Sequence, residues 1–392
     1  MSVTYPLGFT AAGVAAGLKA SGGLDLALVV NDGASIAAAA TFTTNRFAAA
    51  PVSWSRDVMT AAKASGRAPR AVVLNSGGAN ACTGERGAAD AAQTAAAAAG
   101  ALDGVAPDEV LVCSTGLIGV PLPPPLLLAG VATAQKALSS AGGLDAARAI
   151  MTTDTHPKTA RADVGGYRLG GMAKGAGMLA PGLATMLVVV TTDATLTSEA
   201  AQAALEEACA VTFNRIDSDG CMSTNDTVIL LASGASGVVP DTCGFTAALT
   251  AVCQDLALQL IRDAEGASHD IAIRVTGATT EEAGLAVARA VSRSNLVKAA
   301  VFGRDPNWGR VLAAAGTVPA EVAPFDPAMV DVSINGVMVA RDGGAHEDRR
   351  LVDLSARGVE IVLGLHAGEA EVTLYTNDLT YDYVKENAEY SS

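Results

Sequence analysis

The chain has 392 residues, of which 50% are hydrophobic, so it can bury a sizeable core and we expect two domains. Its net charge of −14 repels phosphate backbones and anionic lipid, which argues against nucleic-acid and membrane partners. The N-terminal stretch lacks the basic region of a signal peptide, and no run reaches the roughly 20 apolar residues of a membrane span. Six cysteines form neither a CxxC pair nor a Cys/His cluster. These features predict a reduced, cytoplasmic protein without a metal.

Short apolar runs alternate along the chain with alanine-rich amphipathic segments. In chain order, strands are predicted at 26–30, 36–42, 71–74, 110–113, 186–192, 227–232, 271–276, 330–334, 359–363 and 370–375. Helices are predicted at 56–64, 87–99, 144–151, 198–214, 245–263 and 281–293, the fourth with Thr197 as its N-cap. Because no strict βαβ rhythm is present, we expect a layered α/β (α+β) sandwich rather than a doubly wound sheet. The expected boundary at 276–281 divides the chain into domains 1–277 and 278–392.

Two motifs resemble ligand-binding loops but fail on context. GAGMLA at 175–180 fits a loose dinucleotide fingerprint, yet Pro181 and Gly182 stand where a helix should begin. The segment FNRIDSDGCMSTNDT at 213–227 contains four potential metal ligands, Asp217, Asp219, Asn225 and Asp226. A calcium loop requires Glu at its twelfth position, which here is Val228. We therefore expect a hydrogen-bonded connection into a strand, with a metal loop as the minority alternative.

Two polar segments follow predicted elements and offer groups for binding. Ser114, Thr115 and Gly116 end the strand of 110–113, and small residues with free backbone N–H groups at a strand end suit an oxyanion hole. The segment MTTDTHPK at 151–158 follows a helix, and its hydroxyls either bind a substrate or cap that helix. On local sequence alone, an ordinary polar turn or helix cap is the better explanation of each segment.

The segment KGAGMLAPGLATMLVVVTTDA at 174–194 joins a Gly/Pro-rich loop directly to a buried strand, with Thr185 at the junction. A threonine in a strained loop can attack the preceding carbonyl, and hydrolysis of the resulting ester frees a new N-terminus. The freed α-amine, with an ordinary pKa of about 7.7–8.0, is a base beside its own hydroxyl. Thr185 is therefore a candidate nucleophile, although a Gly/Pro loop that enters a strand is also common.

Several motifs together resemble the arginine-biosynthesis glutamate N-acetyltransferases, also called ornithine acetyltransferases. They are LNSGGANACTG (74–84), STG (114–116), IMTTDT (150–155), KGAGMLAPGLATML (174–187), STNDT (223–227), DPNWGR (305–310) and the C-terminal YVKENAEYSS. The similarity runs from about residue 8 to Ser392. Within 213–227, Ser218 and Cys221 depart from the family pattern, in which Val and Asp are more usual.

The resemblance implies self-cleavage between Ala184 and Thr185, which would give mature chains 1–184 and 185–392. These chains are expected to remain associated as a heterotetramer of two α and two β chains. The implied fold is an αββα-type sandwich of the self-processing aminopeptidase superfamily with a smaller C-terminal α/β domain, whose tail returns to the active site.

The implied reaction is a ping-pong acetyl transfer from N-acetylornithine to glutamate through acetyl-Thr185, without a cofactor. Thr115 and Gly116 match the oxyanion-hole positions. The family's substrate-binding positions are matched by Thr152, Lys174, Thr185, Glu265, Asn387 and Ser392. In this reading a cationic Lys174 suits a substrate carboxylate, and Glu265 suits the ornithine ammonium.

Three alternatives stay open from the sequence. Family members differ in whether acetyl-CoA also serves as acetyl donor. A self-cleaving aminopeptidase or amidase would resolve the acyl-enzyme with water instead of glutamate. A non-catalytic protein that binds acetylated amino acids would keep the fold without cleavage.

Overall fold

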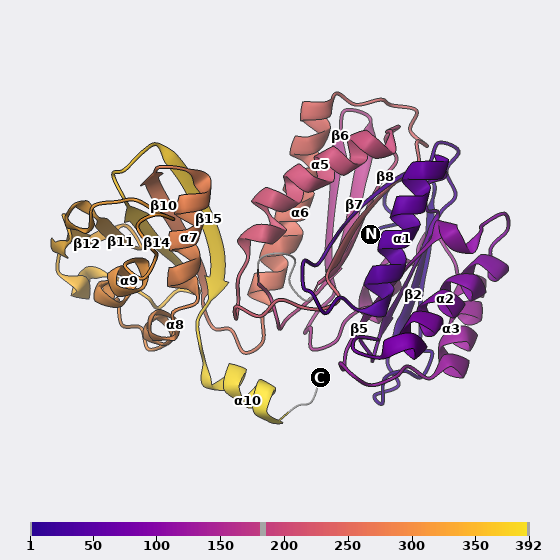
Figure 1. The fold of residues 1–392 in the computed structure, drawn as a ribbon, viewed down its shortest axis with the longest axis horizontal. Coiled ribbons are helices and arrows are strands. Elements are labelled where there is room, and N and C mark those ends of the chain that lie inside the picture. Colours follow the sequence, from indigo (N-terminus) through magenta and orange to yellow (C-terminus); the bar gives the residue numbers. More distant parts are fainter. Residues whose placement is uncertain (1, 181–185, 390–392) are drawn as a thin grey trace.

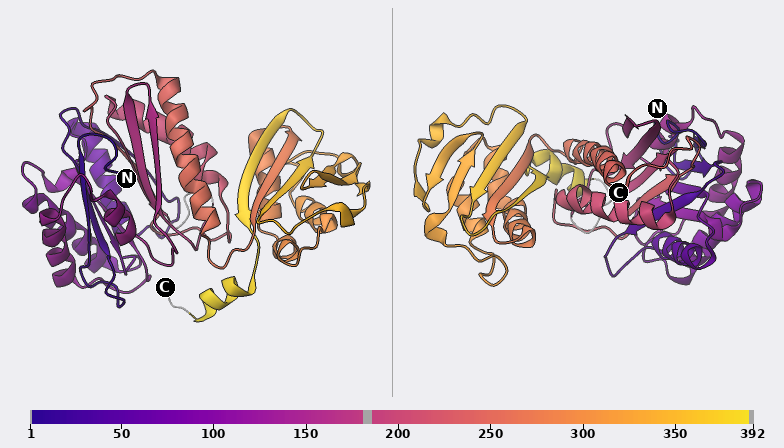
Figure 2. Two further views of the ribbon diagram at one scale, coloured as in Figure 1. Left: turned by 180° about the vertical axis from the view of Figure 1, so that it is seen from behind. Right: turned by 90° about the horizontal axis from the view of Figure 1, so that it is seen from above.

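A computed structural model describes residues 2–180 and 186–389 and shows two units joined side by side (Figure 1). The first unit holds two sheets and ends at 264–269, and the second unit is built on a third sheet that begins at residue 270. The last helix, α10 (Tyr381–Glu389), leaves the second unit and runs back beside the first, as the view from behind also shows (Figure 2).

Sheet A of the first unit has the strand order β1 (Phe9–Val14), β2 (Leu26–Asn31), β4 (Ala71–Ser76) and β5 (Val110–Thr115). Its strands pair antiparallel except β4 and β5, which are parallel. Sheet B has the order β3 (Ala37–Phe42), β9 (Thr227–Ala232), β8 (Leu187–Thr192), β7 (Tyr167–Lys174) and β6 (Lys158–Val164). Here only β8 and β9 are parallel.

The two sheets pack face to face, with helices on both outer surfaces. Val72 and Leu74 of sheet A meet Val189 and Leu231 of sheet B in the buried layer between them. Sheet A is covered by α2 (Gly84–Ala101) and α3 (Pro124–Lys136), while α1 (Ala50–Ser65) packs on β5 and α4 (Gly143–Ala149) on β1. Sheet B is covered by α5 (Ser198–Val211) and α6 (Thr242–Arg262). This αββα order confirms the predicted fold class.

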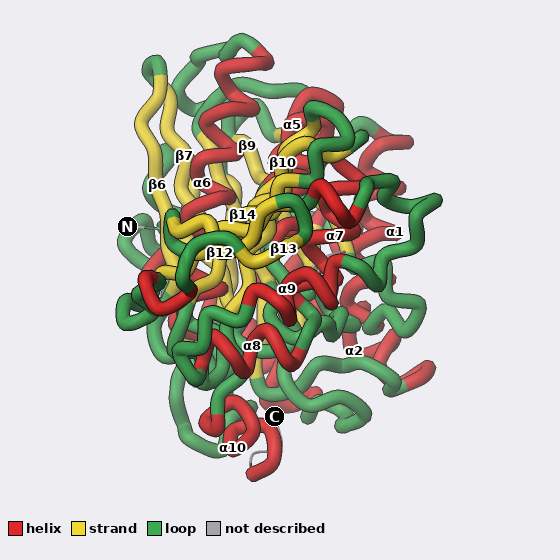
Figure 3. Tube along the Cα trace, turned by 90° about the vertical axis from the view of Figure 1, so that its left-hand side faces the viewer, coloured by secondary structure: helices red, strands yellow, loops and turns green. Residues whose placement is uncertain are grey.

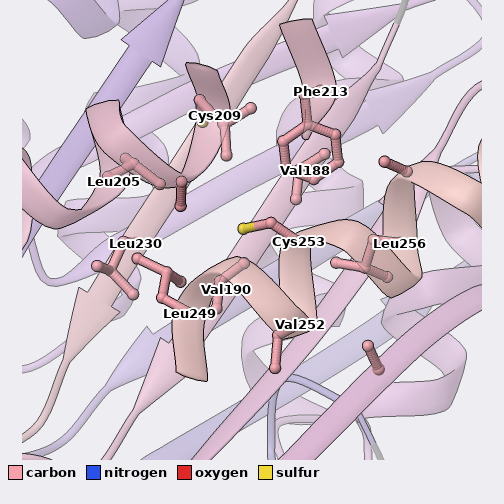
Figure 4. Packing of buried hydrophobic residues seen from close by; sticks show 14 of the residues in the cluster. Val188, Val190, Leu205, Cys209, Phe213, Leu230, Leu249, Val252, Cys253 and Leu256 are labelled. Atoms are coloured by element: carbon pink, nitrogen blue, oxygen red, sulfur yellow. The ribbon is translucent and has the colours of Figure 1, made fainter. Parts of the chain in front are cut away.

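The outer core on sheet B is made of interlocking aliphatic side chains. In this cluster Val190 of β8 lies beside Leu249 and Val252 of α6, and Val188 lies beside Phe213 and Cys253 (Figure 4). Such burial contributes about 1.5–3 kcal/mol per large aliphatic side chain. By length and composition, α6 is also the one described helix apolar enough to cross a membrane, and 50% of its most apolar stretch is buried inside this fold.

The second unit has one six-stranded sheet with helices on one side (Figure 3). Its strand order is β13 (Gly344–Ala345), β12 (Val337–Arg341), β11 (Asp331–Ile334), β14 (Gly358–Gly364), β10 (Asp270–Ala278) and β15 (Ala370–Asn377). The covering helices are α7 (Glu281–Ser292), α8 (Asn295–Phe302) and α9 (Trp308–Ala315).

The division between the units lies earlier than the predicted 277/278. β10 pairs with β14 and β15, and its alternating buried residues Ile271, Ile273 and Val275 belong to the core of the second unit. The boundary therefore precedes residue 270, because a strand belongs to the sheet with which it is hydrogen-bonded. Sequence patterning located this strand but not its partners.

Candidate active site

Lys174 and Thr115 bring the two sheets of the first unit into contact at one end. Lys174 is the last residue of β7 and Thr115 the last of β5, and both are buried. Lys174 Nζ donates to Thr115 Oγ1 at 3.1 Å. The predicted carboxylate-binding cation and one of the two predicted oxyanion-hole residues are thus direct neighbours, although they lie 59 positions apart in the sequence.

The backbone turns sharply after Thr115 in a way that only glycine accommodates. The Thr115 carbonyl accepts the N–H groups of Gly77 and Gly78, both at 3.0 Å. Gly116 has φ +127°, and a Cβ there would lie 2.6 Å from Gly78 N. A side chain at Gly116 would therefore require both a strained φ and a shift of the neighbouring backbone. The predicted oxyanion pair stands at a strand end, as expected, with Gly116 packed against a second glycine turn.

A buried charge network surrounds Lys174. Asp154 Oδ1 accepts from Lys158 Nζ at 2.5 Å and from Gly175 N at 2.7 Å, and Lys158 Nζ also donates to Asp263 Oδ2 at 2.5 Å. Burial alone would raise the pKa of Asp154, but the charges of Lys174 and Lys158 hold it at about 2. Burial lowers the pKa of Lys174, and Asp154 partly offsets this. The network places an anion near the buried Lys174 that favours its charged form.

Glu265 joins three segments of the predicted site. Its Oε1 accepts from Thr153 Oγ1 at 2.9 Å, and its Oε2 accepts from Asn387 Nδ2 of α10 at 3.0 Å. Its backbone N–H donates to Ala176 O at 3.0 Å, in the loop that follows Lys174. A Cβ on Gly177 would lie 2.6 Å from Glu265 Oε2, so this loop needs glycine to lie against the carboxylate. The predicted ammonium-binding group therefore connects the loops at 152–155 and 175–177 with the C-terminal helix.

The structure brings together most of the described residues that the sequence predicted for the site. Thr152 N donates to Asp154 Oδ2 at 2.9 Å, which links this residue to the Lys174 network. Asn387 reaches the site through Glu265, as the expected return of the C-terminal tail requires. Ala184, Thr185 and Ser392 lie outside the described residues, so their predicted roles stay predictions.

Sequence reasoning missed the charged residues that support the site. Asp154, Lys158 and Asp263 are buried and form ion pairs with one another, and Asp154 also accepts from Gly175 N after Lys174, yet none carries a motif of its own. Asp154 and Lys158 are four residues apart in TTDTHPK, a polar stretch beside a predicted helix. The available signal was that an acid and a base stand four positions apart in a stretch otherwise interpreted as a turn.

The connection at 213–227 is a hydrogen-bonded loop, as predicted. Asp219 Oδ2 accepts from Met178 N at 2.7 Å, and Ser218 N donates to Leu179 O at 2.5 Å. These contacts hold the loop that follows Lys174. Ser218, one of the two departures from the family pattern, also donates to Asn377 Oδ1 at 2.8 Å, and the other departure, Cys221, is exposed. Across residues 2–180 and 186–389, no group of three or more His, Cys, Asp or Glu side chains is arranged to hold a metal ion.

A separate cleft of about 370 Å³ lies between α6 and the sheet of the second unit. Its lining includes Leu258, Ala272 and Tyr375, and none of the predicted site residues is among the residues that line it. The predicted site residues therefore lie apart from this cleft.

The chain was compared with models of known protein families. The model of the ArgJ family matches residues 10–392. The chain belongs to the ArgJ family. This membership confirms the resemblance drawn from the sequence motifs.

Relatives within the ArgJ family are similar along their whole length. The arginine biosynthesis bifunctional protein ArgJ of Streptomyces coelicolor is 57% identical over 392 residues, which cover 100% of both chains. The protein of the same name from Bifidobacterium longum is 55% identical over 397 residues, again covering 100% of both. The solved structure of ornithine acetyltransferase complexed with ornithine from Mycobacterium tuberculosis is 50% identical, with a TM-score of 0.42, and covers 47% of this chain and 96% of that one.

Proposed function

We propose that this chain is a glutamate N-acetyltransferase of arginine biosynthesis, which moves the acetyl group of N-acetylornithine to glutamate after cleavage between Ala184 and Thr185. The observation that carries the proposal is the contact of Lys174 with Thr115. Lys174 begins the segment of the sequence that leads directly to Thr185. This contact supports the proposal, because a lysine suited to a substrate carboxylate lies beside the strand end that we propose stabilises an oxyanion. The printed name of the full-length relatives, an arginine biosynthesis bifunctional protein, supports the same pathway.

The proposed cycle has two acyl-transfer steps. Thr185 Oγ attacks the acetyl carbonyl of N-acetylornithine, the C–N bond breaks, and the Thr185 amine passes the hydroxyl proton to the departing ornithine nitrogen. The α-amine of glutamate then attacks acetyl-Thr185, and the released Oγ recovers its proton. Backbone N–H groups at Thr115 and Gly116 would stabilise the oxyanion in both steps. Loss of one such donor typically lowers kcat by a factor of about 10²–10³.

The charges around the site support amino-acid substrates. Lys174 would bind a carboxylate, while Glu265, held between Thr153 and Asn387, would bind the side-chain ammonium of ornithine. We further propose acetyl-CoA as a second donor, because the relatives are named bifunctional. The proposed acetyl transfer needs no cofactor. We also propose that the cleaved protein is a cytoplasmic heterotetramer of two α and two β chains.

The decisive experiment combines a denaturing gel with an acetyl-transfer assay on the wild-type protein and on Thr185→Ala. We expect two wild-type fragments, N-acetylglutamate as product, and an intact variant whose activity falls by a factor on the order of 10⁴ or more. Thr197→Ala, which removes a helix cap, is the control and should lose about 1 kcal/mol of stability but neither cleavage nor transfer.

Other outcomes separate the alternatives. Cleavage with release of free acetate and no N-acetylglutamate would favour the hydrolase. An intact wild-type chain, or normal turnover by Thr185→Ala, would contradict the proposed nucleophile.

A further inference from the structure

A fully buried carboxyl group, that of Asp226, contacts the chain immediately after the proposed nucleophile. Asp226 precedes β9, and its Oδ1 accepts from Met186 N at 3.0 Å. Thr227 N in turn donates to Met186 O at 3.1 Å. Since Met186 N belongs to the peptide bond that joins Thr185 to Met186, Asp226 fixes the amide on the C-terminal side of Thr185.

The second oxygen of this carboxyl group, Asp226 Oδ2, is also buried. The hydroxyl groups of Ser223 and Thr43 lie close enough to Asp226 to favour its charged form by hydrogen bonding. Thr43 Oγ1 also donates to Ser223 O at 2.7 Å. The carboxyl group is therefore held among polar groups beside Met186 N.

The surroundings of Asp226 act on its pKa in two directions. Burial raises the pKa well above the ordinary value, while the Met186 N–H, the charge of Lys174 and the hydroxyls of Ser223 and Thr43 lower it. Lys174 makes no ion pair with it, since its described hydrogen bond goes to Thr115. In either protonation state Oδ1 can accept the Met186 N–H.

We propose that Asp226 is a positioning residue of the acetyl-transfer site, whose buried carboxyl group fixes the Thr185–Met186 amide through the Met186 N–H. This inference rests on the proposed function, because it assigns Asp226 a role only if Thr185 reacts. Asp226 forms no covalent bond and transfers no net charge. Its hydrogen bond to Met186 N makes the start of β8 a rigid support for the chain that precedes the strand.

The test compares Asp226→Asn with Asp226→Ala in the full-length protein. The Asn side chain keeps an acceptor for the Met186 N–H, whereas Ala removes it. We expect Asp226→Asn to cleave and transfer within about threefold of wild type, with the same pH profile. Asp226→Ala should fall about 30-fold in cleavage rate and kcat, which corresponds to about 2 kcal/mol at roughly 1.4 kcal/mol per tenfold.

Asp193→Asn is the matched control at the other end of the same strand. Asp193 is also buried and accepts the backbone N–H groups of Arg168 at 2.7 Å and Leu7 at 3.0 Å. Its variant should unfold more easily but cleave and transfer normally. An equal loss in Asp193→Asn would show a merely structural effect and overturn the inference.

The remaining outcomes also decide. Wild-type rates in Asp226→Ala would overturn the inference, and so would an Asp226→Asn variant that is inactive, because an acceptor for the Met186 N–H would then not be what the site requires. If Asp226→Ala does not fold, the cleavage rate, kcat and pH profile of Asp226→Asn alone decide whether the inference holds. A wild-type chain that stays intact contradicts the proposed function itself, whereas a cleaving wild type with an equally active Asp226→Ala contradicts only this inference.

Discussion

Lys174 Nζ and Thr115 Oγ1 form a hydrogen bond of 3.1 Å that joins the ends of β7 and β5 across the two facing sheets. The pair is buried, and the nearest anionic support is Asp154, which also holds the loop after Lys174 through Gly175 N. A binding cation and a proposed oxyanion group therefore share one rigid location. Both are set by strand ends, which position side chains more firmly than loops do.

Replacing Lys174 with Met should impair substrate binding while keeping the volume of the side chain. Loss of a buried, charge-assisted contact costs about 2–5 kcal/mol, so kcat/KM for N-acetylornithine should fall about 100-fold or more. Steady-state kinetics measure the effect, with Lys136→Met at the end of α3 as the control. Activity of Lys174→Met within threefold of wild type would show that Lys174 does not bind the substrate.

Gly116→Ala should lose activity because its added Cβ meets Gly78 N at 2.6 Å in a backbone of φ +127°. The required shift displaces the proposed oxyanion donors, and we expect kcat to fall about 100-fold. Gly119→Ala is a matched control, because Gly119 also has a positive φ of +80° but a Cβ there meets nothing within 4 Å. Equal losses in the two variants would indicate backbone strain rather than the position of the donors.

Glu265 and Asn387 should be energetically coupled, since Asn387 Nδ2 donates to Glu265 Oε2. In a double-mutant cycle of Glu265→Gln and Asn387→Ala, the losses in kcat/KM for N-acetylornithine should deviate from additivity by about 0.5–1 kcal/mol. Lys385→Ala, on the same exposed helix, should add to Glu265→Gln without coupling. Strict additivity for Asn387 would mean that α10 does not act through Glu265.

Asp154 should make stability depend on pH in the acidic range. Its pKa is lowered from 3.8 unfolded to about 2 in the fold, so its contribution is complete above about pH 4 and is lost as pH falls through 2. At about 1.4 kcal/mol per unit of pKa, the change amounts to about 2 kcal/mol. Urea unfolding of wild type and Asp154→Asn between pH 6 and pH 2.5 measures it, with exposed Asp108→Asn as the control. A constant difference between the two proteins would contradict this assignment.

Elements with a clear hydrophobic period could be predicted from the sequence, and those shaped by close contacts could not. The buried strands β2, β8 and β9 and the amphipathic α7 match their predicted positions, and Thr197 caps α5 as expected. β7 was missed because Gly170 and Gly171 interrupt its pattern. A Cβ on Gly170 would lie 2.3 Å from Ser2 O, so this glycine reflects a tertiary contact that no local pattern records.

The candidate site shows the same limit. Motifs located Thr115 and Lys174, and the family resemblance indicated Glu265. The structure joins Lys174 to Thr115 and Glu265 to Thr153 and Asn387. The supporting groups Asp154 and Asp226 were not recognised, since their role comes from burial and from partners distant in sequence. A carboxylate in a polar stretch looks alike in sequence whether it faces solvent or a buried lysine.

The strand order of sheet B has a further consequence for the cleaved protein. β8 and β9 follow Thr185 in the sequence, and they lie between β3 on one side and β7 on the other, both of which precede it. Cleavage would thus leave one sheet composed of strands from two polypeptides. Denaturation would separate them, so refolding would become second order and the melting temperature would rise with protein concentration. Intact Thr185→Ala would refold as a single chain at a rate independent of dilution.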